Sequence, residues 1–266
     1  MKKLTFFAAV IAAMAFTACG GNKSAQTAEA TDSVKSFEQT QIEEKIKIEL
    51  DSLAAEVGKL KSLPIVQSES GIQLTAEEKQ VKPDFLLAPA VAEEATTLAE
   101  KYRILSALSV DKKIAALYDM PTEEYDQAIS KLAADINDPS FKAIDDATTL
   151  FEAGQNLYDA MNENGRINYF WQLTGASLVE EIYALTQNTD KFITAFDDDA
   201  AANVTFRIVL LSDAISRLAE YDPEVEPVAN AVEALSPLNA INVDQLKNQL
   251  VEAKEKIAEA RAKLLK

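Results

Sequence analysis

The chain of 266 residues has no histidine and only one cysteine. Without histidine, a serine or cysteine nucleophile has no imidazole base, so Ser–His–Asp triads and Cys–His dyads are excluded. The usual zinc sites, which need histidine or several cysteine ligands, are excluded for the same reason. Glycine is also scarce, with seven residues, and no glycine-rich phosphate loop is present. The catalytic side chains that remain are carboxylates, lysines, serines and tyrosines.

Basic residues are outnumbered, because 26 Lys and Arg residues stand against 43 Asp and Glu residues, for a formal net charge of −17. A chain this acidic, without a basic cluster, is repelled by nucleic acids and by anionic lipid surfaces. We therefore expect no DNA or RNA partner. Among so many carboxylates, adjacent pairs such as Asp145-Asp146 and Glu180-Glu181 arise by chance, and neighbours on a helix point in different directions. A glycosidase-like pair brought together by the fold is the enzymatic alternative, and the expectation is a non-enzymatic protein without a cofactor.

The first nineteen residues have the order of an export signal. Lys2 and Lys3 form a positive region, residues 4–16 form an apolar run, and small residues then lead to Cys19. The apolar run is shorter than the roughly 20 residues that span a bilayer. The segment resembles a bacterial lipoprotein signal, in which Cys19 becomes the lipidated first residue of the mature protein. It departs from that pattern at Phe16, where Leu is usual, and the alternative is an ordinary secretory signal with a chance cysteine.

The resemblance implies attachment to a membrane through N-terminal acyl chains. Gly20 is not the Asp that retains many lipoproteins at the inner membrane, so the implied location is the outer membrane, facing the periplasm. Residues 20–36 hold no large apolar residue except Val34, which is typical of a flexible tether. Removal of the signal also removes two lysines and brings the net charge to −19. The predicted organisation is a signal peptide over 1–18, a lipid-anchored tether over 19–36 and a single all-helical domain over 37–266.

The rest of the chain repeats apolar residues three or four positions apart and shows no sustained period of two, which predicts an all-α fold. We expect an antiparallel bundle of eight to ten helices. The first and last of them are expected to pack on the same body, and the alternative is that one of them lies against a partner. Ile65-Val66 is the one place where a short extended piece is expected. The predicted helical segments, some of which are short connectors between neighbouring helices of the bundle, are 34–62, 75–82, 89–108, 109–118, 121–136, 139–165, 167–187, 189–196, 204–221, 223–235 and 242–266.

The densest aromatic cluster in the sequence is Tyr169-Phe170-Trp171, which contains the only tryptophan. Core packing is the favoured interpretation, because a buried helical stripe accommodates Phe170 or Trp171. The alternative is an aromatic pocket between helices that holds a small or apolar ligand. Its candidate residues are Tyr158, Tyr169, Phe170 and Trp171.

Two acidic or polar runs have the appearance of cation sites. Asp197, Asp198 and Asp199 could bind calcium weakly, but they stand where a helix is expected to begin, and N-capping explains them without a metal. The run 162–167 resembles the middle of an EF-hand loop, yet the first and twelfth loop positions lack carboxylates. A helix C-cap at Gly165 is the favoured interpretation, so no metal is expected.

Together these features predict a lipid-anchored periplasmic helical protein that acts as a non-enzymatic interaction or scaffolding module of the cell envelope. Its partners would be the membrane, through the acyl chains, and other envelope proteins. The sequence leaves the oligomeric state open. The alternative function is binding of a small or apolar ligand near Trp171.

Overall fold

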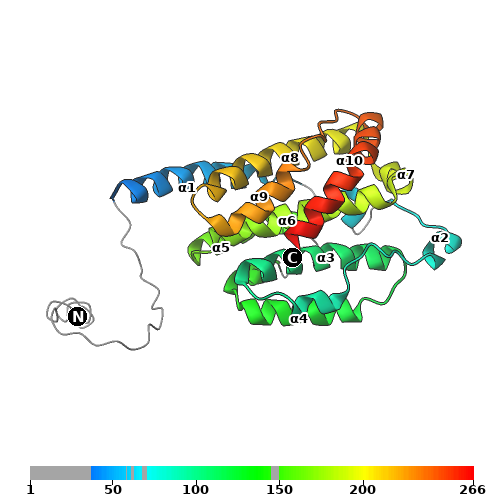
Figure 1. Cartoon of the computed structure of the whole chain (residues 1–266), viewed down its shortest axis with the longest axis horizontal. Helices are drawn as coiled ribbons and strands as arrows, with labels where there is room; N and C mark the ends of the chain where they lie inside the picture. Colours follow the sequence, from blue (N-terminus) through cyan, green and yellow to red (C-terminus); the bar gives the residue numbers. More distant parts are fainter. Residues whose placement is uncertain (1–36, 58, 61–62, 68–70, 145–149) are drawn as a thin grey trace, which may run out of the picture. The chain divides into compact units, whose positions relative to one another are not determined.

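The computed structural model describes residues 37–57, 59–60, 63–67, 71–144 and 150–266. Every regular element in these ranges is a helix, so the predicted all-α class is confirmed there (Figure 1). The predicted signal peptide and tether, with Cys19, lie outside the described residues, as does Asp145-Asp146. The main compact unit begins at Gln41, within the first helix. The α-helices are α1 Phe37–Val57, α2 Ala76–Gln80, α3 Leu98–Leu117, α4 Glu123–Ile136, α5 Leu150–Glu163, α6 Ile167–Gln187, α7 Thr189–Phe192, α8 Asp198–Ala219, α9 Glu226–Glu233 and α10 Val243–Leu264.

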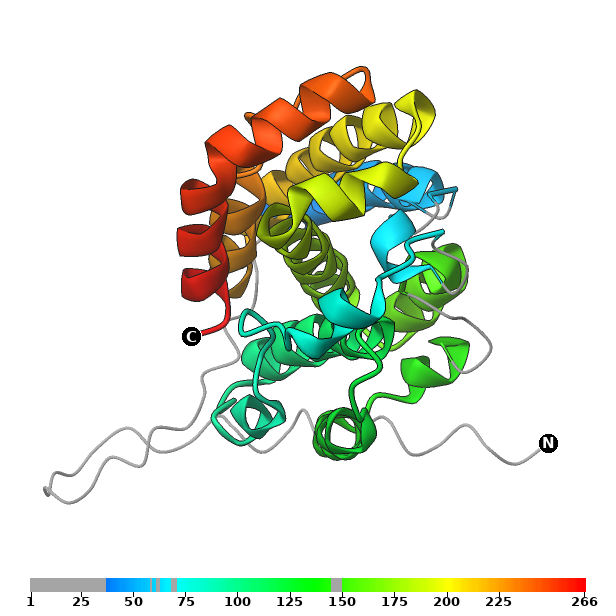
Figure 2. The same ribbon diagram turned by 90° about the vertical axis from the view of Figure 1, so that its right-hand side faces the viewer.

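Helix α6 is the centre of the bundle. It packs against α3, α5, α8, α9 and α10, and the views in Figures 1 and 2 show these helices around it. A helix surrounded in this way has no solvent face, which explains why α6 is apolar on nearly every side. Its only charged residues are Glu180 and Glu181, and both are buried.

Neighbouring helices approach α6 closely at Gly175. A Cβ atom at this position would lie 2.5 Å from Val228 Cγ2 of α9 and 2.8 Å from Ile215 Cδ1 of α8. Both distances are shorter than real contacts between carbon atoms. Only glycine therefore allows α8 and α9 to pack this tightly on the central helix.

The first and last helices both pack on this body, as expected. Leu50, Ala54 and Val57 of α1 are buried in the same core as Leu250 and Ile257 of α10. Tyr158 of α5 also donates a hydrogen bond of 2.6 Å to Asp51 of α1. Since Leu50 and Val57 stand seven positions apart, the predicted stripe of α1 is the face that the core covers.

Several predicted helix ends are confirmed. Thr75 begins α2 with a reciprocal capping box to Glu78, and the Asn242 side chain accepts from the Gln245 amide at the start of α10. Gly165 follows α5 with a φ of 68° and is the predicted C-cap. The run 162–167 is therefore the joint between two helices.

The single helix predicted over 89–108 is wrong. Residues Pro89–Glu93 form a short 3₁₀-helix, and α3 begins only after Thr97, whose capping box with Glu100 satisfies the first amides of the helix. The break predicted at Ser109 is also wrong, because α3 continues through it. The Ser109 hydroxyl donates to the Leu105 carbonyl at 2.7 Å, a bond that a serine makes inside a helix without ending it.

Three other expectations need correction. Ile65-Val66 is not extended, because Pro64–Val66 forms a 3₁₀ turn with both apolar side chains buried. Helix α1 ends at Val57, earlier than predicted. The segment 139–165 is not one helix: it contains a 3₁₀-helix at Pro139–Ile144 and then α5, which is kinked at Gly154 with a φ of 37°.

Candidate functional site

The predicted aromatic residues divide into two groups. Tyr158, Phe170 and Trp171 are buried together, and the centroid of the Phe170 ring lies 5.0 Å from that of Tyr158 and 5.1 Å from that of Trp171, both edge to face. This is the geometry of core packing, the favoured interpretation. Tyr169 does not join them, because its ring stacks on Tyr102 at 4.6 Å. The four residues thus do not line a common space, and a ligand site near Trp171 stays a prediction.

The second aromatic group is part of a polar network at the joint between α5 and α6. Tyr102 donates a hydrogen bond of 2.5 Å to Asp138 and accepts one of 2.8 Å from Arg166. Burial and the bond to Asp138 raise the pKa of Tyr102. Because Asp138 also caps the 3₁₀-helix by accepting from the Ser140 amide, the network fixes how three segments meet.

The three predicted aspartates act at the start of α8. Asp197 accepts a hydrogen bond of 2.7 Å from the Ala200 amide as its N-cap, and Asp198 accepts one of 2.9 Å from the Val243 amide of α10. The capping interpretation is therefore confirmed for Asp197. Asp199 is exposed. Over the ranges that the structure describes, no group of three or more acidic or thiol side chains is placed to hold a metal ion.

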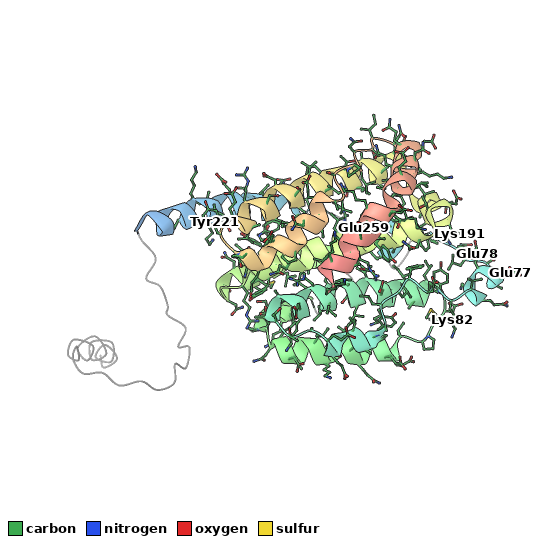
Figure 3. The ribbon with its side chains drawn as sticks, in the orientation of Figure 1. Glu77, Glu78, Lys82, Lys191, Tyr221 and Glu259 are labelled. Atoms are coloured by element: carbon green, nitrogen blue, oxygen red, sulfur yellow. The ribbon has the colours of Figure 1, made fainter. Side chains whose placement is uncertain are left out.

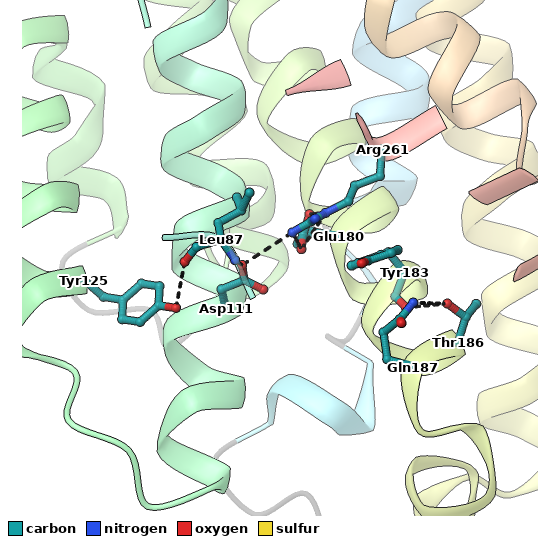
Figure 4. A network of polar contacts seen from close by, with 8 residues as sticks. All are labelled: Leu87, Asp111, Tyr125, Glu180, Tyr183, Thr186, Gln187 and Arg261. Atoms are coloured by element: carbon teal, nitrogen blue, oxygen red, sulfur yellow. Dashed lines mark hydrogen bonds and ion pairs between the residues drawn. The ribbon is translucent and has the colours of Figure 1, made fainter. Parts of the chain in front are cut away.

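A group of buried charges forms a site that the sequence did not predict, between α3, α6 and α10 (Figure 4). Arg261 donates to Glu180 through Nη2 to Oε1 at 2.7 Å and through Nε to Oε2 at 2.8 Å. The same Nη2 lies 3.7 Å from Oδ2 of Asp111. One guanidinium thus stands between two buried carboxyl groups, and its carbon lies 4.1 Å from the centre of the Tyr183 ring.

The loop 83–89 closes this site from outside the bundle. The Leu87 amide donates to Asp111 Oδ2 at 2.7 Å, and the Leu87 carbonyl accepts from the Tyr125 hydroxyl at 2.9 Å. Phe85 packs edge to face on Tyr183. The loop is therefore held by α3, α4 and α6 together.

Burial raises the pKa of Asp111, and the neighbouring Glu180 raises it further, while the Leu87 amide and Arg261 oppose the shift. Among the described residues no group donates to Oδ1 of Asp111. A bare carboxylate oxygen is costly in the core, so this environment favours the protonated acid. Burial also raises the pKa of Tyr125 to about 12. The carboxyl groups of Asp111 and Glu180 are buried, so the site is closed to substrate.

Glu181 points to the other side of α6. It accepts hydrogen bonds from the Ser177 hydroxyl at 3.1 Å and the Leu63 amide at 3.3 Å, and it lies 3.9 Å from Nη1 of Arg207. Burial raises the pKa of Glu181 and lowers that of Arg207 to about 10. The adjacent pair Glu180-Glu181 is therefore split between two networks, as expected for neighbours on a helix.

A half-open pocket of about 380 Å³ lies next to this second network. Leu63, Pro64 and Gln67 line one side of it, and Asn203 and Arg207 of α8 line the other. It is distant in sequence from Trp171 and was not predicted. Its lining, partly polar and partly apolar, differs from the aromatic pocket that was the alternative interpretation of the sequence.

The sequence contained a signal for these networks. Helix α6 reads as apolar on every face, which indicates a buried helix, and buried carboxylates require partners. Glu180 and Glu181 could therefore have been assigned as paired core residues. Their partners Asp111, Arg207 and Arg261 are distant in sequence, and no local pattern identifies them.

The outer side of α8 exposes apolar side chains. Phe206 and Val209, three positions apart on one helix face, are 47% and 63% exposed. Ile241 is 70% exposed, and it follows Ala240, whose carbonyl accepts a hydrogen bond of 2.8 Å from Thr205 of α8. We call Phe206, Val209 and Ile241 the α8 surface. Clustered exposed apolar residues are typical of sites that bind another molecule.

Comparison with protein-family models, with curated proteins and with solved structures found no match. In the part of the chain that the structure describes, no helix combines the length and apolar character of a membrane span.

Proposed function

We propose that this chain is a lipid-anchored, non-enzymatic interaction module of the bacterial cell envelope, and that it meets its partner through the α8 surface. The observation that carries the proposal is the exposure of Phe206 and Val209 on a helix whose other face is packed in the core. Exposed apolar side chains reduce solubility unless a partner covers them, so their presence on one helix face supports a docking role.

A non-enzymatic role is supported by the composition and by the buried carboxylates. The chain has no histidine. Arg261 binds Glu180, while Ser177 and the Leu63 amide bind Glu181, and a substrate would have to displace these contacts. Groups already satisfied inside a core serve stability and positioning better than proton transfer to a substrate.

The proposed location is the outer membrane, with the domain in the periplasm. The support is the lipoprotein-like signal that ends at Cys19 and the tether that follows it. Each buried methylene of an acyl chain contributes roughly 0.8 kcal/mol, so two or three chains hold the protein firmly. The acidic domain itself is repelled by anionic lipid, which leaves envelope proteins as its partners and excludes nucleic acids.

The test is site-specific photo-crosslinking of the full-length protein in its native envelope. The photoreactive residue p-benzoylphenylalanine replaces Val209 in one variant and Val251 in the other. Val251 is the matched control, because it is a valine of α10 with 61% exposure. We expect one discrete protein adduct from position 209 and none from position 251. The same pattern from both positions, or no protein adduct from position 209, would refute the proposal.

Ligand binding is the second candidate function, and the pocket beside Arg207 supports it more than the aromatic cluster does. Its mixed lining of Gln67, Asn203 and Arg207 suits a small polar molecule. Native mass spectrometry of the full-length protein tests it. A stoichiometric small molecule released by denaturation would favour this function over the interaction module.

A further inference from the structure

We infer that the α8 surface binds a basic, amphipathic segment of its partner, with apolar side chains on Phe206, Val209 and Ile241 and with lysines or arginines around them. The inference rests on the proposed function and adds the chemistry of the partner. It is carried by the distribution of charge around these three residues.

The stretch of chain that contains the α8 surface has an excess of exposed negative charge. Between Lys191 and Lys247 the sequence contains no lysine at all, and its only arginines are Arg207 and Arg217. The structure describes this whole stretch, and its exposed carboxylates are those of Asp197, Asp198, Asp199, Asp213, Glu220, Glu224, Glu226, Glu233 and Asp244.

Neither arginine offers positive charge to a partner. Arg207 is 1% exposed and lies in the network with Glu181. Arg217 is held between two carboxylates, with Nη1 2.7 Å from Glu49 and Nε 3.0 Å from Asp213. A molecule that approaches the α8 surface therefore meets apolar groups in a stretch whose exposed charges are mostly negative.

This excess of negative charge discriminates between occupants. A second copy of the chain would bring the same carboxylates to the interface, and like charges across an interface cost several kcal/mol. An anionic lipid surface is repelled in the same way. A segment with Lys or Arg beside its apolar residues gains both burial and attraction, and charge complementarity also speeds its association.

The first part of the test identifies the peptide crosslinked to position 209 by mass spectrometry. We expect apolar residues and an excess of Lys and Arg. We also expect the yield to fall roughly tenfold or more between about 0.05 M and about 1 M salt, where the Debye length is only about 3 Å. A neutral or acidic peptide, a second copy of this chain or a lipid adduct would overturn the inference.

The second part compares two variants that remove the same charge. Asp213→Asn with Glu220→Gln neutralises two carboxylates of α8 and the turn after it, while Glu255→Gln with Glu259→Gln neutralises two exposed carboxylates of α10 (Figure 3 labels Glu259). We expect the first pair to lower the adduct yield at least threefold and the second to leave it unchanged. An equal effect of both pairs would overturn the inference and leave the proposed function standing. Loss of every protein adduct in the otherwise unaltered chain would overturn the proposed function itself.

Discussion

Arg261 near the end of α10 forms a bidentate ion pair with Glu180 in α6, through two hydrogen bonds, although 81 positions separate the two residues. Glu180 is 1% exposed, and most of the Arg261 side chain is also covered. Bidentate arginine–carboxylate pairs are among the strongest polar contacts in proteins. The last helix is thus fastened to the central helix by charge as well as by apolar packing.

Replacement of this arginine should be severely destabilising. In Arg261→Met, Glu180 and Asp111 lose the cation between them, and a buried charge left without its partner typically costs about 3–5 kcal/mol. Urea denaturation followed by circular dichroism measures the free energy of unfolding. Arg217→Met is the matched control, because Arg217 also makes two ion pairs but is exposed, so a loss within about 1 kcal/mol is expected. Equal losses in the two variants would show that the buried ion pair contributes no more to the free energy of unfolding than the exposed one.

The Asp111 carboxyl should make stability fall as pH rises. Its pKa is raised in the folded protein above the value of about 3.9 in an unfolded chain, so the folded state holds this proton more tightly. The corresponding stabilisation is complete below about pH 4 and is lost as pH rises through the folded pKa. The Asp111→Asn variant lacks this titrating group. The difference between its free energy of unfolding and that of wild type should therefore become more positive as pH rises, by at most about 1.4 kcal/mol per pH unit. A difference that shrinks with pH would contradict the expected sign.

A methyl group at Gly175 should destabilise the bundle. Gly175→Ala improves helix propensity by about 1 kcal/mol, but the added Cβ clashes with Val228 and Ile215, and overpacking of a core costs roughly 1–3 kcal/mol. The net loss should shrink when Val228→Ala is added, because that change removes the nearest atom. A double-mutant cycle on thermal or urea unfolding measures this coupling. Strict additivity of the two changes would rule out the clash.

The anchor is tested by metabolic labelling with a fatty acid. Cys19→Ser should abolish labelling completely and release the protein from the membrane fraction, because a serine cannot form the thioether of a lipoprotein. Ser24→Ala, five residues further along, should change neither measurement. Full labelling of the Cys19→Ser protein would show that the lipoprotein resemblance misleads.

The parts of this fold that could be predicted are those set by neighbours in sequence. Periodic apolar residues gave α6 from Ile167 to Gln187, and local capping residues gave the start of α2 at Thr75. The break before α3 had a local signal as well, since Thr97 and Glu100 have the spacing of a capping box. The apolar residues continue at helical spacing on both sides of this break, so the periodicity predicted a single helix over 89–108.

The buried charges could not be predicted, because apolar periodicity indicates which face of a helix is buried but not which residues of other helices contact it. Asp111, Glu180 and Arg261 come from three helices, and only the folded arrangement brings them together. The α8 surface is a similar case. Phe206 and Val209 belong to an ordinary helical sequence, and only the exposed fractions separate them from the core residues Val204 and Ile208.

The ion pair between Arg261 and Glu180 also affects when the chain can fold during translation. At roughly 5–20 residues per second, a ribosome needs about 4–16 s to add the 81 residues from Glu180 to Arg261. During that interval the carboxylate of α6 has no cation, so the nascent bundle cannot close around it at low cost. We therefore expect this part of the core to close only after the final helix has been synthesised.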